Sequence, residues 1–332
     1  MGNELLNLNG KKVLITGGLG FIGSNLAHKC LELGAKVTIF DCLDPRSGGK
    51  LFNIDDIKDS IELCNHDVLN FDQISHHVPD KDIIFNCASS TSHSFSMREP
   101  WVDLDINGKG MINVLEAIRR FNRDVKFICV GTSTQLGKLH YQPADENHPE
   151  FPTDIYSANK SVSEKYTLIY SRAYNMRATV IRVSNVFGPR ASIHSLDFTF
   201  NNYFMGLALQ GKNVTIYGKG GQKRNIIYVE DVVSSLIMAS QSEKTNGEVF
   251  FAVSDEHFSV SEIAEATVKH MGGGKVVHVD WPVGRKEVDV GDAVISNKKI
   301  KECLNWSPRF NLETGLKETK KYYDTCLKEY FM

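Results

Sequence analysis

The sequence predicts an α/β fold in which a doubly wound parallel sheet is followed by a smaller C-terminal α/β domain. Short runs of β-branched and aromatic residues alternate with longer amphipathic stretches, and these runs are apolar almost throughout. Strands that are apolar on both faces are typical of a parallel sheet that helices cover on both sides. The alternation weakens after about residue 185, which indicates a change of domain there.

The first half supplies most of the regular elements. Expected strands are 12–17, 36–41, 61–67, 82–88, 125–132 and 178–183, and expected helices are 21–33, 70–77, 103–122 and 154–175. In the second half, a stretch rich in Gly, Asn and aromatic residues (189–225) precedes an apolar run at 226–239, a strand at 248–253, and helices near 259–271, 296–304 and 312–329. We expect 1–185 to form one domain and 186–332 a smaller one that closes over a ligand. The boundary is soft because no low-complexity linker separates the two, and we expect the chain to interleave between them.

Composition narrows the class of protein. The 332 residues are 42% hydrophobic and 23% charged with a formal net charge of -2, which favours a globular protein whose partners include neither nucleic acid nor a membrane. Seven scattered cysteines without CxxC spacing fit a reducing compartment. No apolar stretch reaches about 18 residues and no charged-then-apolar leader opens the chain, so we expect a cytoplasmic protein. The eleven histidines show no HExxH pattern, and the adjacent His76 and His77 cannot share a helix face, so we predict no metal site.

A glycine turn lies between the first strand and the first helix. Gly17, Gly20 and Gly23 have GxxGxxG spacing, which allows a tight turn and lets a pyrophosphate approach the backbone at a helix N-terminus. Asp41 closes the next strand about 20 residues on, where a carboxylate binds ribose hydroxyls and repels a 2′-phosphate, so NAD is favoured over NADP. Arg46 could favour NADP, but we interpret it as a solvated loop residue. Further cofactor contacts are expected from Phe21, Ile22, Asp67, Val68, Ala88 and Ser89.

A tyrosine and a lysine are placed to share a helix face. Tyr156 and Lys160 have YxxxK spacing, and residues four apart on a helix are neighbours. The lysine ammonium and a positive nicotinamide ring would favour the phenolate, which could act as a general base toward a sugar hydroxyl. The preceding strand ends in a hydroxyl-rich segment that begins at Thr132, and Asn107 lies in a helix that could pass under the lysine.

These motifs together resemble the extended short-chain dehydrogenase/reductase family, in its NAD-dependent nucleotide-sugar epimerase/dehydratase branch, and are similar to UDP-glucose 4-epimerase. The resemblance covers nearly the whole chain and rests on the glycine turn, Asp41, Asp67-Val68, "INGKGMINVLEA", "YSANK", "RVSNVFGPR", "IYGKGGQKRNIIYVEDVV" and "LNWSPRFNLETGLKETKKYY". It implies a Rossmann-type NAD-binding domain (1–185) and a nucleotide-sugar-binding domain (186–332).

The resemblance also implies roles for single residues. Tyr156 would be the base, Lys160 would bind the nicotinamide ribose, and Asn107 would be a supporting member. The hydroxyl that holds the substrate oxygen matches Thr132, with Ser133 as second choice. The chain departs from the family at Leu136, where a tyrosine is usual.

Two carboxylates distinguish the reactions of this family, and this chain lacks both. Its 4,6-dehydratases have an Asp-Glu pair where this chain has Ser133 and Thr134, and its UDP-glucuronate decarboxylases have a glutamate matching Thr134. A hydroxyl cannot replace either carboxylate near pH 7. We therefore expect an NAD-dependent epimerase that acts at C4 of a UDP-sugar and keeps its NAD. A C2-epimerase, a dehydrogenase or 4-ketoreductase, and a non-catalytic NAD-binding regulator remain alternatives.

The resemblance places the substrate in the second half of the chain. It implies that Asn185, Arg224 and Arg285 bind the diphosphate, that Ile216 and Tyr217 flank the nucleotide base, and that Asn201 and Phe204 lie on a helix that closes over the ligand. It also implies a homodimer that pairs through helices 103–122 and 154–175.

Overall fold

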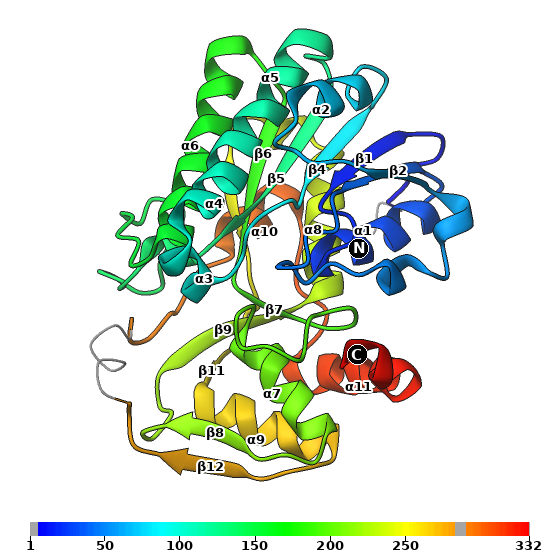
Figure 1. Cartoon of the computed structure of the whole chain (residues 1–332). Coiled ribbons are helices and arrows are strands. Elements are labelled where there is room, and N and C mark those ends of the chain that lie inside the picture. Colours follow the sequence, from blue (N-terminus) through cyan, green and yellow to red (C-terminus); the bar gives the residue numbers. More distant parts are fainter. Residues whose placement is uncertain (1–5, 283–289, 332) are drawn as a thin grey trace.

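A seven-stranded sheet forms the centre of the computed structural model, which describes residues 6–282 and 290–331 (Figure 1). All neighbouring strands of this sheet run parallel, in the order β10-β6-β5-β4-β1-β2-β3. Their bounds are β1 (Lys12–Thr16), β2 (Lys36–Asp41), β3 (Glu62–Asn65), β4 (Ile83–Asn86), β5 (Lys126–Thr132), β6 (Ala178–Val183) and β10 (Val249–Ala252). The predicted doubly wound α/β fold is confirmed.

Helices cover both faces of this sheet, as its apolar strands require (Figure 1). In β1, Val13 and Ile15 face one core and Leu14 faces the other, because side chains alternate along a strand. The first core includes α1 (Phe21–Glu32), α8 (Val229–Ser240) and α10 (Lys298–Leu304), and the second includes α2 (Phe71–His77), α5 (Met111–Phe121) and α6 (Ile155–Tyr174).

Two helices that the sequence predicts, at 154–175 and 103–122, can be compared with those of the structure. At the start of α6 the Asp154 side chain accepts a hydrogen bond from the Ser157 amide, and at its end Asn175 takes a left-handed conformation. The single helix expected at 103–122 is divided into α4 (Pro100–Leu104), a π-helical segment (Asp105–Gly110) and α5. Such π segments are frequent at functional sites. The short helix α3 (His93–Arg98) was not predicted.

The chain crosses between the two parts of the molecule more than once. The strand expected at 248–253 is present as β10, but it pairs in parallel with β6 at the edge of the large sheet. Helices α8 and α10 also pack on the core of that sheet. The second half of the chain therefore contributes to both parts.

Among the described residues, the smaller part contains two short sheets and the helices α7, α9 and α11 (Figure 1). One sheet has the order β11-β9-β7 and the other pairs β12 with β8. The bounds are β7 (Asn185–Phe187), β8 (Val214–Tyr217), β9 (Lys223–Tyr228), β11 (His257–Ser259), β12 (Val276–Val279), α7 (Phe200–Leu209), α9 (Val260–Met271) and α11 (Leu312–Cys326). The 189–225 stretch contains α7, where the resemblance places a helix with Asn201 and Phe204, and β8, which was not predicted. Across the described ranges, no helix has the length and apolar character that crossing a bilayer requires.

Candidate active site

A cleft of about 650 Å³ opens where the strand order reverses between β1 and β4. Ligands of open α/β sheets bind at this switch point, outside the carboxyl ends of the strands. Most of the predicted site residues line the cleft: Gly17, Gly20, Phe21, Ile22, Gly23, Asp41, Asp67, Val68, Ala88, Ser89, Thr132, Ser133, Tyr156, Lys160 and Asn185. The structure thus brings together residues from β1 to β7 that are distant in sequence.

The glycine turn fits a pyrophosphate. Gly17 has φ +67° and a Cβ there would lie 2.6 Å from the backbone nitrogen of Ala88, while a Cβ at Gly23 would overlap the carbonyl oxygen of Gly17. Helix α1 starts directly after the turn, and no described side chain caps it. Its first amides are therefore available to an anionic group, and the helix dipole favours negative charge there.

The Asp41 carboxylate is fixed at the end of β2. One oxygen accepts a hydrogen bond from the Leu19 amide (3.0 Å) and the other from the Leu43 amide (2.9 Å). Burial raises the pKa of Asp41, and these two hydrogen bonds oppose that rise. A carboxylate oxygen accepts more than one hydrogen bond, so Asp41 can still bind ribose hydroxyls.

Arg46 is held away from the role that would favour NADP. Its guanidinium forms a salt bridge of 2.6 Å with Asp44 and lies 5.8 Å from the centre of the Phe95 ring. A 2′-phosphate would therefore have to compete with the Asp44 carboxylate for Arg46, and it would also face Asp41. This arrangement favours NAD.

The catalytic candidates meet at the other end of the cleft. The Lys160 ammonium donates to the carbonyl oxygen of Val130 (2.7 Å), and Thr132 lies beside the phenol of Tyr156. Burial raises the pKa of Tyr156 above its usual value of 10; the Thr132 hydroxyl lowers it, and the charges of Asp103 and Asp154 raise it. The chain alone therefore favours the protonated phenol, and the positive charge of a bound nicotinamide ring, in addition to that of Lys160, would favour the phenolate.

Hydroxyl groups form a chain beside Tyr156. The hydroxyl oxygens of Thr132 and Thr134 lie 3.1 Å apart, and the Ser157 hydroxyl donates to Thr134 (2.9 Å). The Ser133 amide donates to the carbonyl of Val183, which fixes the end of β5. The Thr134 position is therefore occupied by a hydroxyl that is already hydrogen-bonded to two neighbours.

Leu136, the residue that departs from the family, lies in a small core cluster with Ala144 and Phe251. Its side chain is buried and does not belong to the described lining of the cleft. The leucine thus contributes to packing behind the β5 end.

Asn107 lies behind the cleft, in the π segment. Its amide donates to the Ser90 carbonyl (3.0 Å) and to the Asp103 carboxylate (3.1 Å), and its oxygen accepts from the Ser89 hydroxyl (2.6 Å). The same Asp103 oxygen accepts from Asn159 (2.8 Å). Asn107 thereby joins the loop after β4 to the helices that carry the catalytic candidates, which is a positioning role.

The predicted substrate residues are only partly brought together. Asn185 lines the cleft and donates to the Asn225 carbonyl (2.9 Å). Tyr217 and Arg224 are not among the described residues that line it, and Arg285 lies outside the described residues. Tyr217 lies with its ring centre 5.8 Å from that of Trp281 instead, and Arg224 donates to the Lys223 carbonyl.

The helix expected to close over the ligand is α7. Asn201 and Phe204 are buried in it, and Ile216 is buried in β8, so none of the three side chains lines the described cleft. The neighbouring Asn202 does line it. Its amide donates to the Val186 carbonyl (3.1 Å), and its buried oxygen has no hydrogen-bond partner among the described residues.

His93 is a second cleft residue that sequence reasoning missed. It begins α3, its Nδ1 lies 2.7 Å from a carboxylate oxygen of Asp154, and its ring meets that of Tyr156 edge-on with centres 4.9 Å apart. The sequence feature that could have identified His93 is its position, because it follows a hydroxyl-rich stretch directly after a predicted strand. Asn202 lies on the helix that the resemblance implied from Asn201 and Phe204, but nothing in the sequence indicated that Asn202, and not these two residues, would line the cleft.

Comparison with known proteins identifies the family. A family model described as GDP-mannose 4,6 dehydratase matches residues 14–319. The chain is 31% identical to UDP-glucuronic acid decarboxylase 1 of Xenopus tropicalis over 94% of this chain and 72% of that protein. It resembles the structure of UDP-glucose 4-epimerase with UDP-glucose from Thermotoga maritima (TM-score 0.86, 28% identity, 95% of this chain and 99% of that chain). It also resembles dTDP-glucose 4,6-dehydratase from Bacillus anthracis in complex with NAD (TM-score 0.83, 26% identity, 96% and 98%).

By name, these relatives include a decarboxylase, a 4-epimerase and a 4,6-dehydratase, and the dehydratase structure is a complex with NAD. The family model spans nearly all of the chain, and the glycine turn, Asp41 and the Tyr156–Lys160 pair occupy the cleft that the fold provides. The chain belongs to the NAD-dependent nucleotide-sugar epimerase/dehydratase branch of the extended short-chain dehydrogenase/reductase family.

Proposed function

We propose that the protein is a nucleotide-sugar 4-epimerase that acts on a UDP-sugar. The observation that carries this proposal is the catalytic end of the cleft, where Tyr156, Lys160 and Thr132 meet and hydroxyl groups occupy positions 133 and 134. This set can move a proton on and off a sugar hydroxyl, and it lacks the carboxylates that elimination and decarboxylation use in this family.

Each residue of the site has a separate role in the proposed reaction. NAD bound at the glycine turn and Asp41 supplies a reversible hydride acceptor. Thr132 holds the reacting hydroxyl, and Tyr156 takes its proton and later returns it. Lys160, anchored on the Val130 carbonyl, binds the nicotinamide ribose and contributes positive charge near the phenol.

The charged residues of the cleft support this division. Among its described lining residues, the carboxylates are those of Asp41, Asp44, Asp67 and Asp105. These belong to β2, to the loops after β2 and β3, and to the π segment, and none belongs to the β5–α6 region that carries the Tyr156 site. None of these described carboxylates is therefore placed in the β5–α6 region to protonate a leaving hydroxyl group.

The nucleotide diphosphate is assigned to the side of the cleft that the smaller part forms. Asn185 and Asn202 line that side, and amide groups donate hydrogen bonds to phosphate oxygens. Arg224, Arg285 and Tyr217 remain predictions from the sequence resemblance for binding the diphosphate and the base.

A panel of UDP-, GDP-, CDP- and dTDP-sugars followed by NMR tests the proposal. We expect one UDP-sugar to be converted to its C4 epimer while NADH absorbance stays flat. Steady NADH formation would indicate a dehydrogenase instead, and conversion only at C2 would overturn the assigned position.

His93 is expected to contribute to substrate binding. Its Nδ1 is engaged by Asp154, which leaves Nε2 for a sugar hydroxyl. We expect His93→Phe, which keeps the ring packing on Tyr156, to raise KM about 3- to 10-fold, the value of one hydrogen bond.

His140→Phe is the matched control, because His140 is exposed and stacks on Phe151. It should leave KM unchanged. If His93→Phe behaves in the same way, His93 has no role in substrate binding.

We also propose a homodimer through α5, α6 and the adjoining α4. These helices expose large apolar side chains: Trp101 is 77% exposed and Ile169 54% exposed, and Tyr174 is exposed near the end of α6. Exposed apolar patches of this kind mark interaction surfaces.

Ile169→Asp should convert the dimer to a monomer in light scattering. Leu51→Asp should not, because Leu51 is similarly exposed (53%) but lies on another surface. A monomeric wild-type protein would contradict this proposal.

A further inference from the structure

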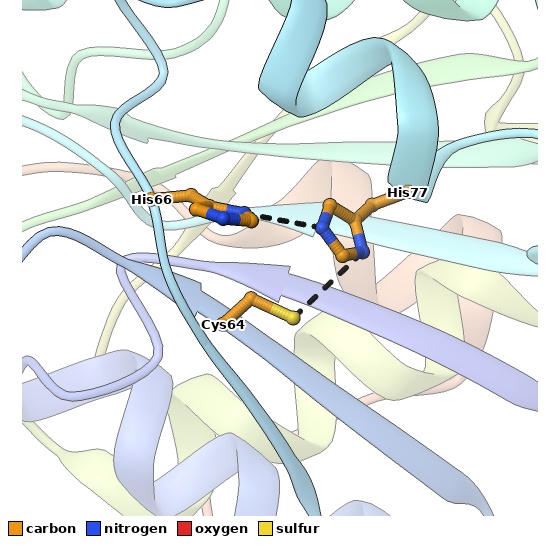
Figure 2. A group of neighbouring side chains, drawn as sticks. All are labelled: Cys64, His66 and His77. Carbon is orange, nitrogen blue, oxygen red and sulfur yellow. Dashed lines mark hydrogen bonds between the residues drawn. The ribbon is translucent and has the colours of Figure 1, made fainter.

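Three potential metal ligands meet beside the edge of the large sheet, apart from the catalytic end of the cleft (Figure 2). Cys64 belongs to β3, His66 follows that strand, and His77 is the last residue of α2. Residues two apart on an extended strand share a face, so Cys64 and His66 point the same way. One ligand atom from each of the three residues lies within 4.8 Å of the other two.

Two separations are close to those between neighbouring ligand atoms of a metal ion, and they involve different nitrogens of His77. His66 Nδ1 lies 3.2 Å from His77 Nε2, and Cys64 Sγ lies 3.7 Å from His77 Nδ1. Tetrahedral zinc with Zn–N of about 2.0–2.1 Å and Zn–S of about 2.3 Å places its ligand atoms roughly 3.3–3.7 Å apart. In the structure, His77 directs Nε2 at His66 and Nδ1 at Cys64. Its ring therefore has to rotate before a single nitrogen can coordinate an ion that all three residues share.

An imidazole binds a metal through an unprotonated ring nitrogen, and a neutral histidine has one such nitrogen.

The thiol has to lose a proton when a metal binds. Burial raises the pKa of Cys64, as does Glu62, whereas Lys81 lowers it. Formation of a metal–sulfur bond therefore breaks the S–H bond and releases that proton to solvent. Phe40, fully buried, packs edge-on against both imidazoles and forms an apolar wall.

We propose that Cys64, His66 and His77 bind one zinc-class divalent ion, with solvent as the fourth ligand. One thiolate and two imidazoles are the donors that zinc prefers, and they would join β3 to the end of α2. This site departs from the absence of metal that the sequence predicts, because the third ligand reaches the other two only through the fold.

Cobalt substitution tests the site directly. The metal-free full-length protein is titrated with Co²⁺ and then with Zn²⁺ under reducing conditions. We expect one equivalent of Co²⁺ to give a thiolate-to-cobalt charge-transfer band, which Zn²⁺ then abolishes. Zn²⁺ should also raise Tm. A wild-type protein that shows no such band overturns the proposal without any variant.

Matched variants locate the ion. Cys64→Ser should remove the band, and His77→Asn should weaken binding at least tenfold. His76→Asn and Cys303→Ser serve as controls, because His76 is exposed on the same helix and Cys303 lies in α10. Binding that survives in both Cys64→Ser and His77→Asn would place the ion elsewhere and contradict the assignment. NAD binding by each variant verifies that it is folded.

Discussion

Tyr156→Phe is expected to lower kcat by about 10²- to 10⁴-fold, the usual contribution of a general acid–base group. The phenol is buried and lies beside Thr132, so its removal leaves the reacting hydroxyl without a proton acceptor. The phenyl ring keeps the packing against His93, so the fold and NAD affinity should persist. Steady-state kinetics and a separate NAD titration check these two expectations.

The control is Tyr141→Phe, which makes the same chemical change at an exposed tyrosine that donates to Asp145. It should leave kcat unchanged. Because burial raises the pKa of Tyr156, the wild-type kcat should also increase as the pH rises from neutral toward alkaline values. Undiminished turnover in Tyr156→Phe would show that another group is the base.

Gly17→Ala is expected to damage both the cofactor site and the fold. The left-handed conformation at φ +67° costs a non-glycine residue about 1–2 kcal/mol, and the added methyl group would lie 2.6 Å from the Ala88 backbone. With a further cost of about 1–3 kcal/mol for overpacking, the free energy of unfolding should fall by about 2–5 kcal/mol. NAD affinity should fall at least tenfold, since the turn cannot keep its shape.

Gly10→Ala is the matched control for this substitution. Gly10 has φ +73°, and a Cβ there would meet no atom within 4 Å. It should cost only the backbone term of about 1–2 kcal/mol and leave NAD affinity unchanged. Equal loss of NAD affinity in both variants would mean that the Gly17 turn is not specific to the cofactor. Denaturant unfolding and NAD titration measure both effects.

The cofactor half of the site could be predicted because its signals are local. The glycine turn, Asp41 and the YxxxK pair each lie within one strand–turn–helix unit or one helix, and the parallel sheet then brings the carboxyl ends of β1, β2 and β5 to one edge. Element periodicity was sufficient to place these residues.

The remaining features of the fold and of the site depend on contacts between segments that are distant in the sequence. The return of β10 to the large sheet pairs Val249 with Val180, and no local pattern specifies that neighbour. Likewise, His93 became a site candidate only when α3 brought it against Tyr156 and Asp154. In these places burial and tertiary packing, rather than spacing along the chain, decide which side chains meet.

The most direct test of the proposed function is to run the reaction in D₂O with the converted UDP-sugar. Hydride held on a nicotinamide does not exchange with solvent, so the C4 epimer should keep protium at C4 and contain no carbon-bound deuterium, with no net NADH formed. NMR and mass spectrometry of the product measure this. Deuterium at C5 or C6 would show that a carbon-bound proton or carboxylate is lost during turnover, and would contradict the epimerase mechanism built on Tyr156 and Thr132.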